Sequence, residues 1–193
     1  MQEKKIFSVQ KLAVIGLMSA IVFVATNIKL EIPTPLGKTM LHFGNVMCIL
    51  GGLLFGGPIG GLAAGFGSAF FDLLDPAFAP EFPITFIMKF AMGYTAGAIA
   101  HRNGAKGEIK KLNLLAAISG ASLYVLLYIT KTFVKSYFFI GEHLNAVLSV
   151  VTLKGLVSLG NAVTAVIVSV LLAATIAPSL RAAGIYKRLE GLR

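Results

Sequence analysis

The sequence predicts an all-α integral membrane protein in which six transmembrane helices form a single domain over residues 1–193. Three observations carry this prediction. Hydrophobic residues make up 56% of the chain, which exceeds the roughly 45–50% that is usual for water-soluble domains. They gather in runs that approach the roughly 20 residues needed to cross the hydrocarbon core of a bilayer. Most charged residues lie between these runs, where they indicate topology.

The expected helices are apolar runs bounded by charged residues, proline or glycine, at 12–29, 42–56, 58–74, 84–100, 112–134 and 147–176. The first run follows three lysines, but it is longer than the apolar stretch of a secretory signal peptide and more apolar runs follow it, so we expect a membrane span. The second and third runs are short, and Gly56-Gly57-Pro58 between them predicts a tight helical hairpin. In the main alternative, which has five helices, 42–74 forms one kinked span plus a re-entrant piece.

The last three runs follow a proline-rich segment, a basic segment and a mixed polar segment, respectively. Eleven basic residues lie at the two termini and in the 101–111 loop, whereas three lie in the loops on the other side, namely Lys29, Lys38 and Lys135. Because Lys and Arg accumulate in cytoplasmic loops, we expect both termini in the cytoplasm. The loops near 30–41, 75–83 and 135–146 then face outside.

Several function classes are excluded by composition and motifs. The net charge of +9 could suggest nucleic-acid binding, but no basic helix or aromatic-studded basic strand is present. Cys48 is the only cysteine, so we expect no intramolecular disulfide, no metal site and no cofactor. The nucleotide-binding motif G-x-x-x-x-G-K-S/T is absent. If ATP drives this protein, another chain must hydrolyse it.

Polar residues inside the apolar runs share helix faces. Tyr124, Tyr128 and Lys131 stand at offsets 0, 4 and 7, and Lys154 and Asn161 are seven apart. With about 1.5 Å of rise per residue, all such residues fall in the outer half of the membrane. The pattern predicts a polar cup that is open to the outside and closed below by an apolar floor. The candidate substrate-binding residues are His42, Asn45, Asp72, Lys89, Tyr124, Tyr128, Lys131, Lys154 and Asn161.

Each candidate also has a structural interpretation that stays open. The lysines could extend to the outer headgroups, the tyrosines could belong to an interfacial belt, and Asp72 and Asp75 could cap the loop or pair with Lys89. Gly57, Gly61, Gly65 and Ala69 recur every four residues, which favours close helix packing within the chain. The first helix differs, because its small face carries no polar residue and could dock a membrane partner through Ala13, Gly16 and Ala20.

The segment from Leu41 to Tyr94 carries a more specific signal, LHFGNVMCILGGLLFGGPIGGLAAGFGSAFFDLLDPAFAPEFPITFIMKFAMGY. Its H-x-G-N start, its G-P-x-G-G-L hairpin and its F-D-L-x-D/N-P segment followed by F-P-x-T-F-x-x-K resemble the substrate-binding (S) components of energy-coupling factor (ECF) vitamin transporters. The resemblance covers the second to fourth helices closely and the six-helix plan loosely. It is greatest for the branch assigned to hydroxymethylpyrimidine or pyridoxine-type vitamins.

The resemblance implies a mechanism and partners. An S component in a bacterial cell membrane binds a small water-soluble vitamin in an outward-facing pocket, covered by the loop after the first helix, here about 30–41. It then delivers the vitamin through a shared transmembrane scaffold subunit and two cytoplasmic ATPase subunits. The scaffold meets a small-residue A-x-x-x-A-like face on the first helix, for which the nearest match here is Gly16 and Ala20.

The chemistry of the vitamin stays open at this point. For a pyrimidine or pyridine alcohol, the expected acceptors are Asp72, Asn45 and Asn161, the expected donors are Lys89, Lys131 and His42, and the two tyrosines would stack on the ring. A carboxylate-bearing vitamin such as pantothenate or folate would instead use the lysines as counter-ions, and riboflavin is a further alternative.

Two other function classes fit the sequence less well. An intramembrane enzyme could use His42 or His143 with Asp72, but no catalytic motif accompanies these residues. A stand-alone facilitator would need polar groups in the inner halves of the helices, where the sequence has only small hydroxyls such as Ser19, Ser119 and Ser169.

Overall fold

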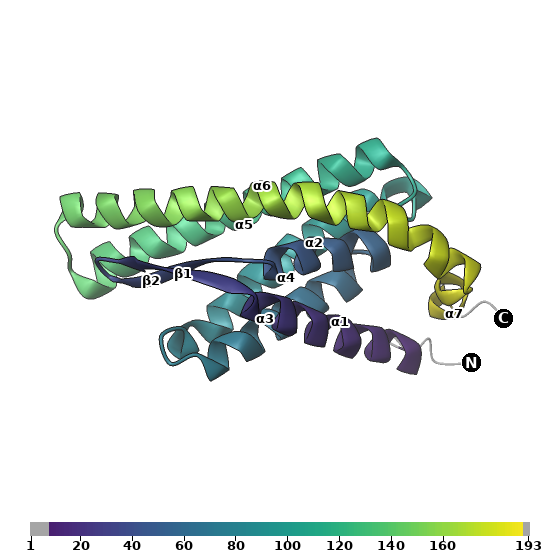
Figure 1. The fold of residues 1–193 in the computed structure, drawn as a ribbon, viewed down its shortest axis with the longest axis horizontal. Helices are drawn as coiled ribbons and strands as arrows, with labels where there is room; N and C mark the ends of the chain where they lie inside the picture. Colours follow the sequence, from purple (N-terminus) through teal and green to yellow (C-terminus); the bar gives the residue numbers. More distant parts are fainter. Residues whose placement is uncertain (1–7, 191–193) are drawn as a thin grey trace, which may run out of the picture.

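The computed structural model describes residues 8–190, which form a helical bundle with one β-hairpin (Figure 1). The elements follow one another as α1 (Val9–Asn27), β1 (Lys29–Thr34), β2 (Gly37–His42), α2 (Gly44–Phe55), α3 (Gly57–Leu74), the short 3-10 helix η1 (Ala79–Glu81), α4 (Phe82–Ala100), η2 (Arg102–Gly104), α5 (Lys110–Val134), the π-helical turn η3 (Lys135–Ile140), α6 (Leu144–Ala182) and α7 (Ile185–Glu190).

The helical fold class is confirmed, since each of the six expected runs coincides with one helix, α1 to α6. Five helical segments among the described residues are long and apolar enough to cross a membrane, and α2 is shorter, with 12 residues. Gly56 separates α2 from α3 with a φ of +83°, and Pro58 lies in the first turn of α3. A left-handed glycine followed by proline ends one helix and starts the next. α2 and α3 are therefore two separate helices, and a six-span count stays a prediction because α2 has only 12 residues.

The glycine repeat of α3 packs against aromatic residues of α4. A Cβ atom at Gly61 would lie 3.0 Å from the Phe90 ring, and one at Gly65 would lie 2.9 Å from the Phe86 ring. Because the two helices run in opposite directions, a four-residue glycine repeat on one meets a four-residue aromatic repeat on the other. The expected use of this repeat for packing within the chain is confirmed.

The segment expected to be an outer loop, 30–41, is instead a β-hairpin. Lys29 pairs with His42 and Thr34 pairs with Gly37 in an antiparallel register. Gly37 has a φ of +98°, which a turn of this kind accommodates more readily with glycine than with any other residue. An alternating run of six residues is too short to stand out beside a long apolar helix, so the sequence pattern did not reveal it.

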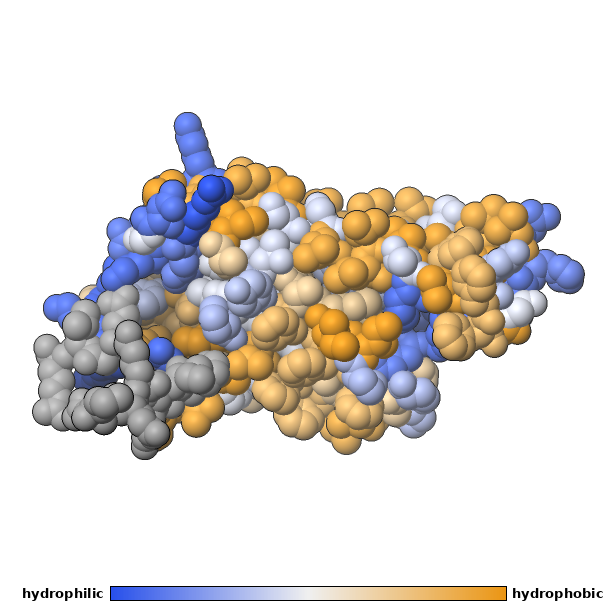
Figure 2. All heavy atoms as spheres, turned by 180° about the vertical axis from the view of Figure 1, so that it is seen from behind, coloured by the Kyte–Doolittle hydropathy of each residue, from blue (hydrophilic) through white to orange (hydrophobic). Residues whose placement is uncertain are grey.

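The elements alternate in direction, so that both described ends of the chain lie at one end of the molecule and the β-hairpin lies toward the other (Figure 1). α2 occupies the centre, where Val46, Cys48, Ile49 and Leu53 are almost fully buried. Large apolar side chains such as Leu17, Ile87, Leu126 and Leu171 are exposed on the outside. Hydrophobic residues cover the middle of the face shown in Figure 2, and hydrophilic residues gather mainly toward its ends. A hydrophobic exterior of this kind suits contact with lipid.

Candidate substrate-binding site

A cavity of about 350 Å³ lies at the end of the molecule opposite the termini. Its walls come from the end of α1, the β-hairpin, the end of α3, the segment around η1, the start of α4, the end of α5 with η3, and α6. Eight of the nine candidate residues line it, namely His42, Asp72, Lys89, Tyr124, Tyr128, Lys131, Lys154 and Asn161. The ninth, Asn45, lies behind Lys89 and is not part of the lining.

The floor of the cavity holds two opposite charges. Lys89 is 3% exposed, and its ammonium group donates a hydrogen bond to Asn45 Oδ1 and lies 3.8 Å from the centroid of the Tyr124 ring. Asp72 is 6% exposed and interacts with the hydroxyl of Thr85. Lys89 therefore does not extend to the headgroups, and its charge is balanced by a carbonyl oxygen, a ring face and the nearby Asp72 carboxylate.

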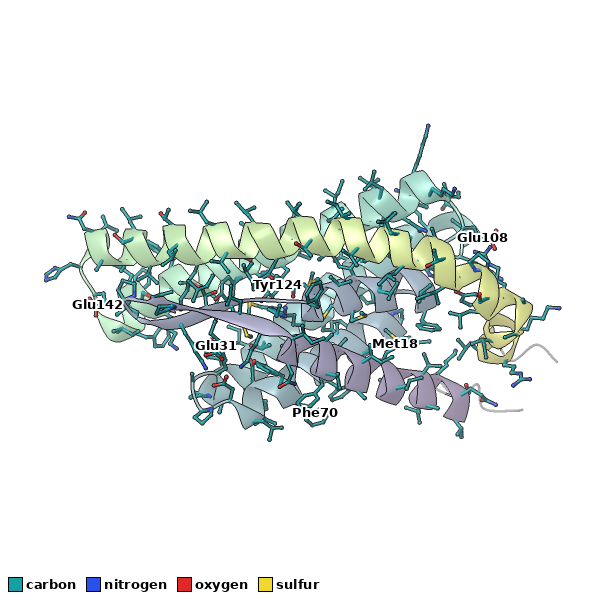
Figure 3. The ribbon with its side chains drawn as sticks, viewed as in Figure 1. Met18, Glu31, Phe70, Glu108, Tyr124 and Glu142 are labelled. Carbon is teal, nitrogen blue, oxygen red and sulfur yellow. The ribbon has the colours of Figure 1, made fainter. Side chains whose placement is uncertain are left out.

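The two tyrosines form one continuous wall on α5. Their ring centroids are 5.9 Å apart and the rings are nearly parallel, at 21°. Tyr124 lies in the middle of the bundle (Figure 3), and Tyr128 shares a hydrogen bond of 3.4 Å with the hydroxyl of Thr39 on β2. The Lys131 ammonium lies 5.0 Å from the Tyr128 centroid. Each tyrosine ring thus has a lysine ammonium group near its face. The two rings therefore stabilise these cations in addition to giving the cavity an aromatic surface.

Glu81 organises the mouth of the cavity. Its carboxylate forms ion pairs with both Lys131 and Lys135, which tie η1 to the end of α5. Sequence reasoning missed this residue, although it is the only acidic residue between the neighbouring prolines Pro80 and Pro83 on the expected outer side. A single acidic residue in an otherwise apolar loop is the sequence feature that could have identified it.

The β-hairpin covers the cavity and is held by side chains from other elements. Asn161 on α6 accepts a hydrogen bond from the His42 backbone N–H at 2.9 Å and donates one to the Met40 carbonyl at 2.8 Å. Lys38 and Lys29 bind Asp75 at the end of α3, at 3.0 and 3.2 Å. The Asn161 amide thus bonds to the hairpin backbone, and its expected contact with the substrate stays a prediction.

Asp75 lies outside the cavity lining and has a structural role. Its carboxylate accepts hydrogen bonds from Lys38, Lys29 and the Ala77 N–H. Partial burial opposes ionisation of this carboxyl, but the three donors outweigh it and hold its pKa below the usual value. Asp75 therefore stays ionised and joins the α3–α4 connection to the hairpin.

His42 is a neutral donor at the cavity wall. Burial, helped by the positive charges of Lys89 and Lys29, holds its pKa well below the usual value. Its Nδ1 accepts a hydrogen bond from the Gly44 N–H at 3.1 Å, which places the proton of the neutral ring on Nε2. His143, the other histidine weighed for an enzyme, is exposed before α6 and lies outside the cavity lining.

The small-residue face of α1 is exposed at Ala13, Gly16 and Ala20. A Cβ atom at Gly16 would have no neighbour within 4 Å. Gly16 and Ala20 border an apolar groove of about 620 Å³ between α1 and α3, which also includes Phe70 (Figure 3). The face is therefore exposed in the described part of the chain, and scaffold docking through it stays a prediction.

The comparisons with known proteins agree with this architecture. A solved structure described as "Structure and mechanism of the S component of a bacterial ECF transporter" superposes with a TM-score of 0.65 at 23% identity, covering 89% of this chain and 97% of that one. A comparison with curated proteins finds no match. The family model described as "ECF-type riboflavin transporter, S component" matches residues 6–178. Since this match spans most of the sequence, the chain belongs to the family of ECF-type riboflavin transporter S components.

Proposed function

We propose that this protein captures a small water-soluble vitamin from outside the cell as the S component of an ECF-type importer. The observation that carries the proposal is the single-ended cavity: polar side chains from α3, α4, α5, α6 and the hairpin converge at the end of the bundle opposite the termini. The positive charge around the termini supports their cytoplasmic placement. The cavity then opens toward the outside.

The protein has no nucleotide-binding motif, so the energy for release must come from partners. Family membership supports a transmembrane scaffold subunit and two cytoplasmic ATPase subunits in that role. The exposed small face of α1 supplies a surface on which a scaffold helix can pack closely.

The preferred substrates are the heteroaromatic alcohols hydroxymethylpyrimidine and pyridoxine, as the sequence motifs indicate. Asp72 and Lys89 at the floor supply an acceptor and a donor for a ring edge, and His42 Nε2 supplies a second donor. Riboflavin is the second candidate, because the matching family model describes a riboflavin transporter component. Its fused rings would present similar edge chemistry with a larger apolar face.

A binding panel tests the proposal. The purified protein, in lipid nanodiscs and without ATP, is tested by thermal shift and calorimetry against hydroxymethylpyrimidine, pyridoxine, riboflavin, pantothenate and folate. We expect one of them to bind without ATP or an ion gradient, since capture needs no energy input. Uptake of that vitamin into liposomes by this chain alone would overturn the proposal in favour of a facilitator.

A further inference from the structure

Lys154 on α6 faces the cavity without a carboxylate partner among the described residues. The residue is partly buried and lines the cavity wall, and among the described residues no carboxylate oxygen lies within 4 Å of its ammonium group. Its electrostatic neighbours are Lys131, Glu81 and Lys135. Because Lys131 and Lys135 already bind Glu81, three ammonium groups share one carboxylate at the mouth.

Ser158, one helical turn further along the same face, also lacks a partner within residues 8–190. Its hydroxyl is buried and makes no hydrogen bond to any described protein atom, although it borders the cavity. Other helical hydroxyls in this chain behave differently: Ser19 donates to the Ile15 carbonyl at 2.8 Å, and Thr132 donates to the Tyr128 carbonyl at 2.8 Å. The unused donor at Ser158 is therefore an independent sign that something from the cavity completes this face.

The charges around the whole cavity point the same way. Five lysines and two carboxylates line it. Lys38 is neutralised from outside the lining by Asp75 and Glu31, at 3.0 and 3.1 Å, which leaves four lysines for two carboxylates. Keeping unpaired cations in a partly enclosed site raises the free energy of the empty protein, and an anion would relieve this cost.

We propose that the α6 face formed by Lys154 and Ser158 binds an anionic group of the captured vitamin, a carboxylate or a phosphate ester, by donating hydrogen bonds from Lys154 Nζ and Ser158 Oγ. This inference rests on the proposed capture function and adds the ionic class of the ligand, so it favours carboxylate-bearing or phosphorylated vitamins over the neutral alcohols preferred above. Asp72 at the floor would repel an anion, so the anionic group lies toward the mouth and the rest of the vitamin lies toward Lys89.

Matched pairs of ligands test this assignment. We would measure the affinity of the protein in nanodiscs for pyridoxine against pyridoxine 5′-phosphate, for riboflavin against riboflavin 5′-phosphate, and for pantothenate against its alcohol, pantothenol. The first two pairs report on a phosphate and the third reports on a carboxylate. The variants are Lys154→Met, Lys154→Arg and Ser158→Ala. The control is Lys110→Met, which removes the same charge from an exposed position at the start of α5.

We expect the anionic member of one pair to bind more tightly than its neutral partner. Lys154→Met should weaken the anionic member by about tenfold to a hundredfold and leave the neutral member unchanged, because charge-assisted hydrogen bonds have that magnitude. Ser158→Ala should weaken it less, Lys154→Arg should restore it, and Lys110→Met should have no effect.

Two results would overturn the inference and leave the capture function intact. One is equal or tighter binding of the neutral member in every pair that binds. The other is a folded Lys154→Met protein, with Ser158→Ala beside it, that keeps wild-type affinity for the anionic member. If no vitamin from the panel or the pairs binds, the capture function itself fails and the inference fails with it.

Discussion

The contact between Asn161 and the hairpin offers a sharp test of how the cavity is covered. Among the described residues, Asn161 is the only helical residue whose side chain hydrogen-bonds to the β2 backbone. It bonds to the His42 N–H at 2.9 Å and to the Met40 carbonyl at 2.8 Å. Asn161→Ala removes both bonds and leaves the α6 helix otherwise intact, since alanine favours helix.

The expected size of the effect follows from these two bonds. Each intramolecular hydrogen bond contributes about 1 kcal/mol net, so the closed hairpin should lose about 2 kcal/mol relative to an opened one. That difference corresponds to an increase of about 30-fold in the population of the opened hairpin. The α-helical bundle beneath it should keep its stability, because the hairpin contributes few core residues.

Hydrogen exchange measured by mass spectrometry, with the protein in nanodiscs, reads this population directly. Peptides covering 38–42 should exchange about 30-fold faster in Asn161→Ala, whereas peptides from α2 and α4 should not change. Thr164→Ala, an exposed position nearly one turn further along α6, serves as the control. Unchanged exchange at 38–42 in a folded Asn161→Ala protein would refute the view that Asn161 holds the hairpin closed.

Three further predictions concern packing, docking and binding. Gly61→Leu should lower the free energy of unfolding by about 1–3 kcal/mol in a thermal or denaturant titration, because the leucine side chain must displace the Phe90 ring. Gly16→Leu is the control, since a Cβ atom there meets nothing within 4 Å. An equal loss of stability in Gly16→Leu would show that the contact with Phe90 is not the cause. Gly16→Leu should keep vitamin affinity but reduce copurification with the scaffold, and intact copurification would assign docking to another face. Lys89→Met should weaken vitamin binding by about tenfold to a hundredfold in calorimetry, as should Asp72→Asn to a smaller extent, since each removes a polar group at the cavity floor. Wild-type affinity in both would leave these two residues with a structural role only.

Much of the candidate site was predictable because helix geometry is periodic. Residues at offsets of three, four and seven share a helix face, so the sequence predicts that Tyr124, Tyr128 and Lys131 lie together. Alternating helix directions then put the polar faces of α3 to α6 at one depth. The structure brings these side chains into one cavity, although their contact with a vitamin stays a prediction.

The partners of individual side chains were not predictable in the same way. Asn45 accepts a hydrogen bond from Lys89, and Asn161 bonds to the β2 backbone while still lining the cavity, so neither contact was expected and substrate contact stays a prediction. An amide side chain has donors and acceptors that suit a ligand, a lysine or a backbone equally well. Which of these it meets depends on distances of about 3 Å between elements far apart in the chain.

A helical membrane protein with one polar end is predictable from the residues alone, because apolar run length, helix period and charge distribution act locally along the chain. Packing between distant elements folds 29–42 back as a hairpin over that end and joins Glu81 to Lys131 and Lys135 at the mouth. It also leaves Lys154 without a counter-ion among the described residues. These outcomes depend on how helices of different length pack against one another. Whether a charged side chain has an ion-pair partner depends on the positions of all the elements packed around it.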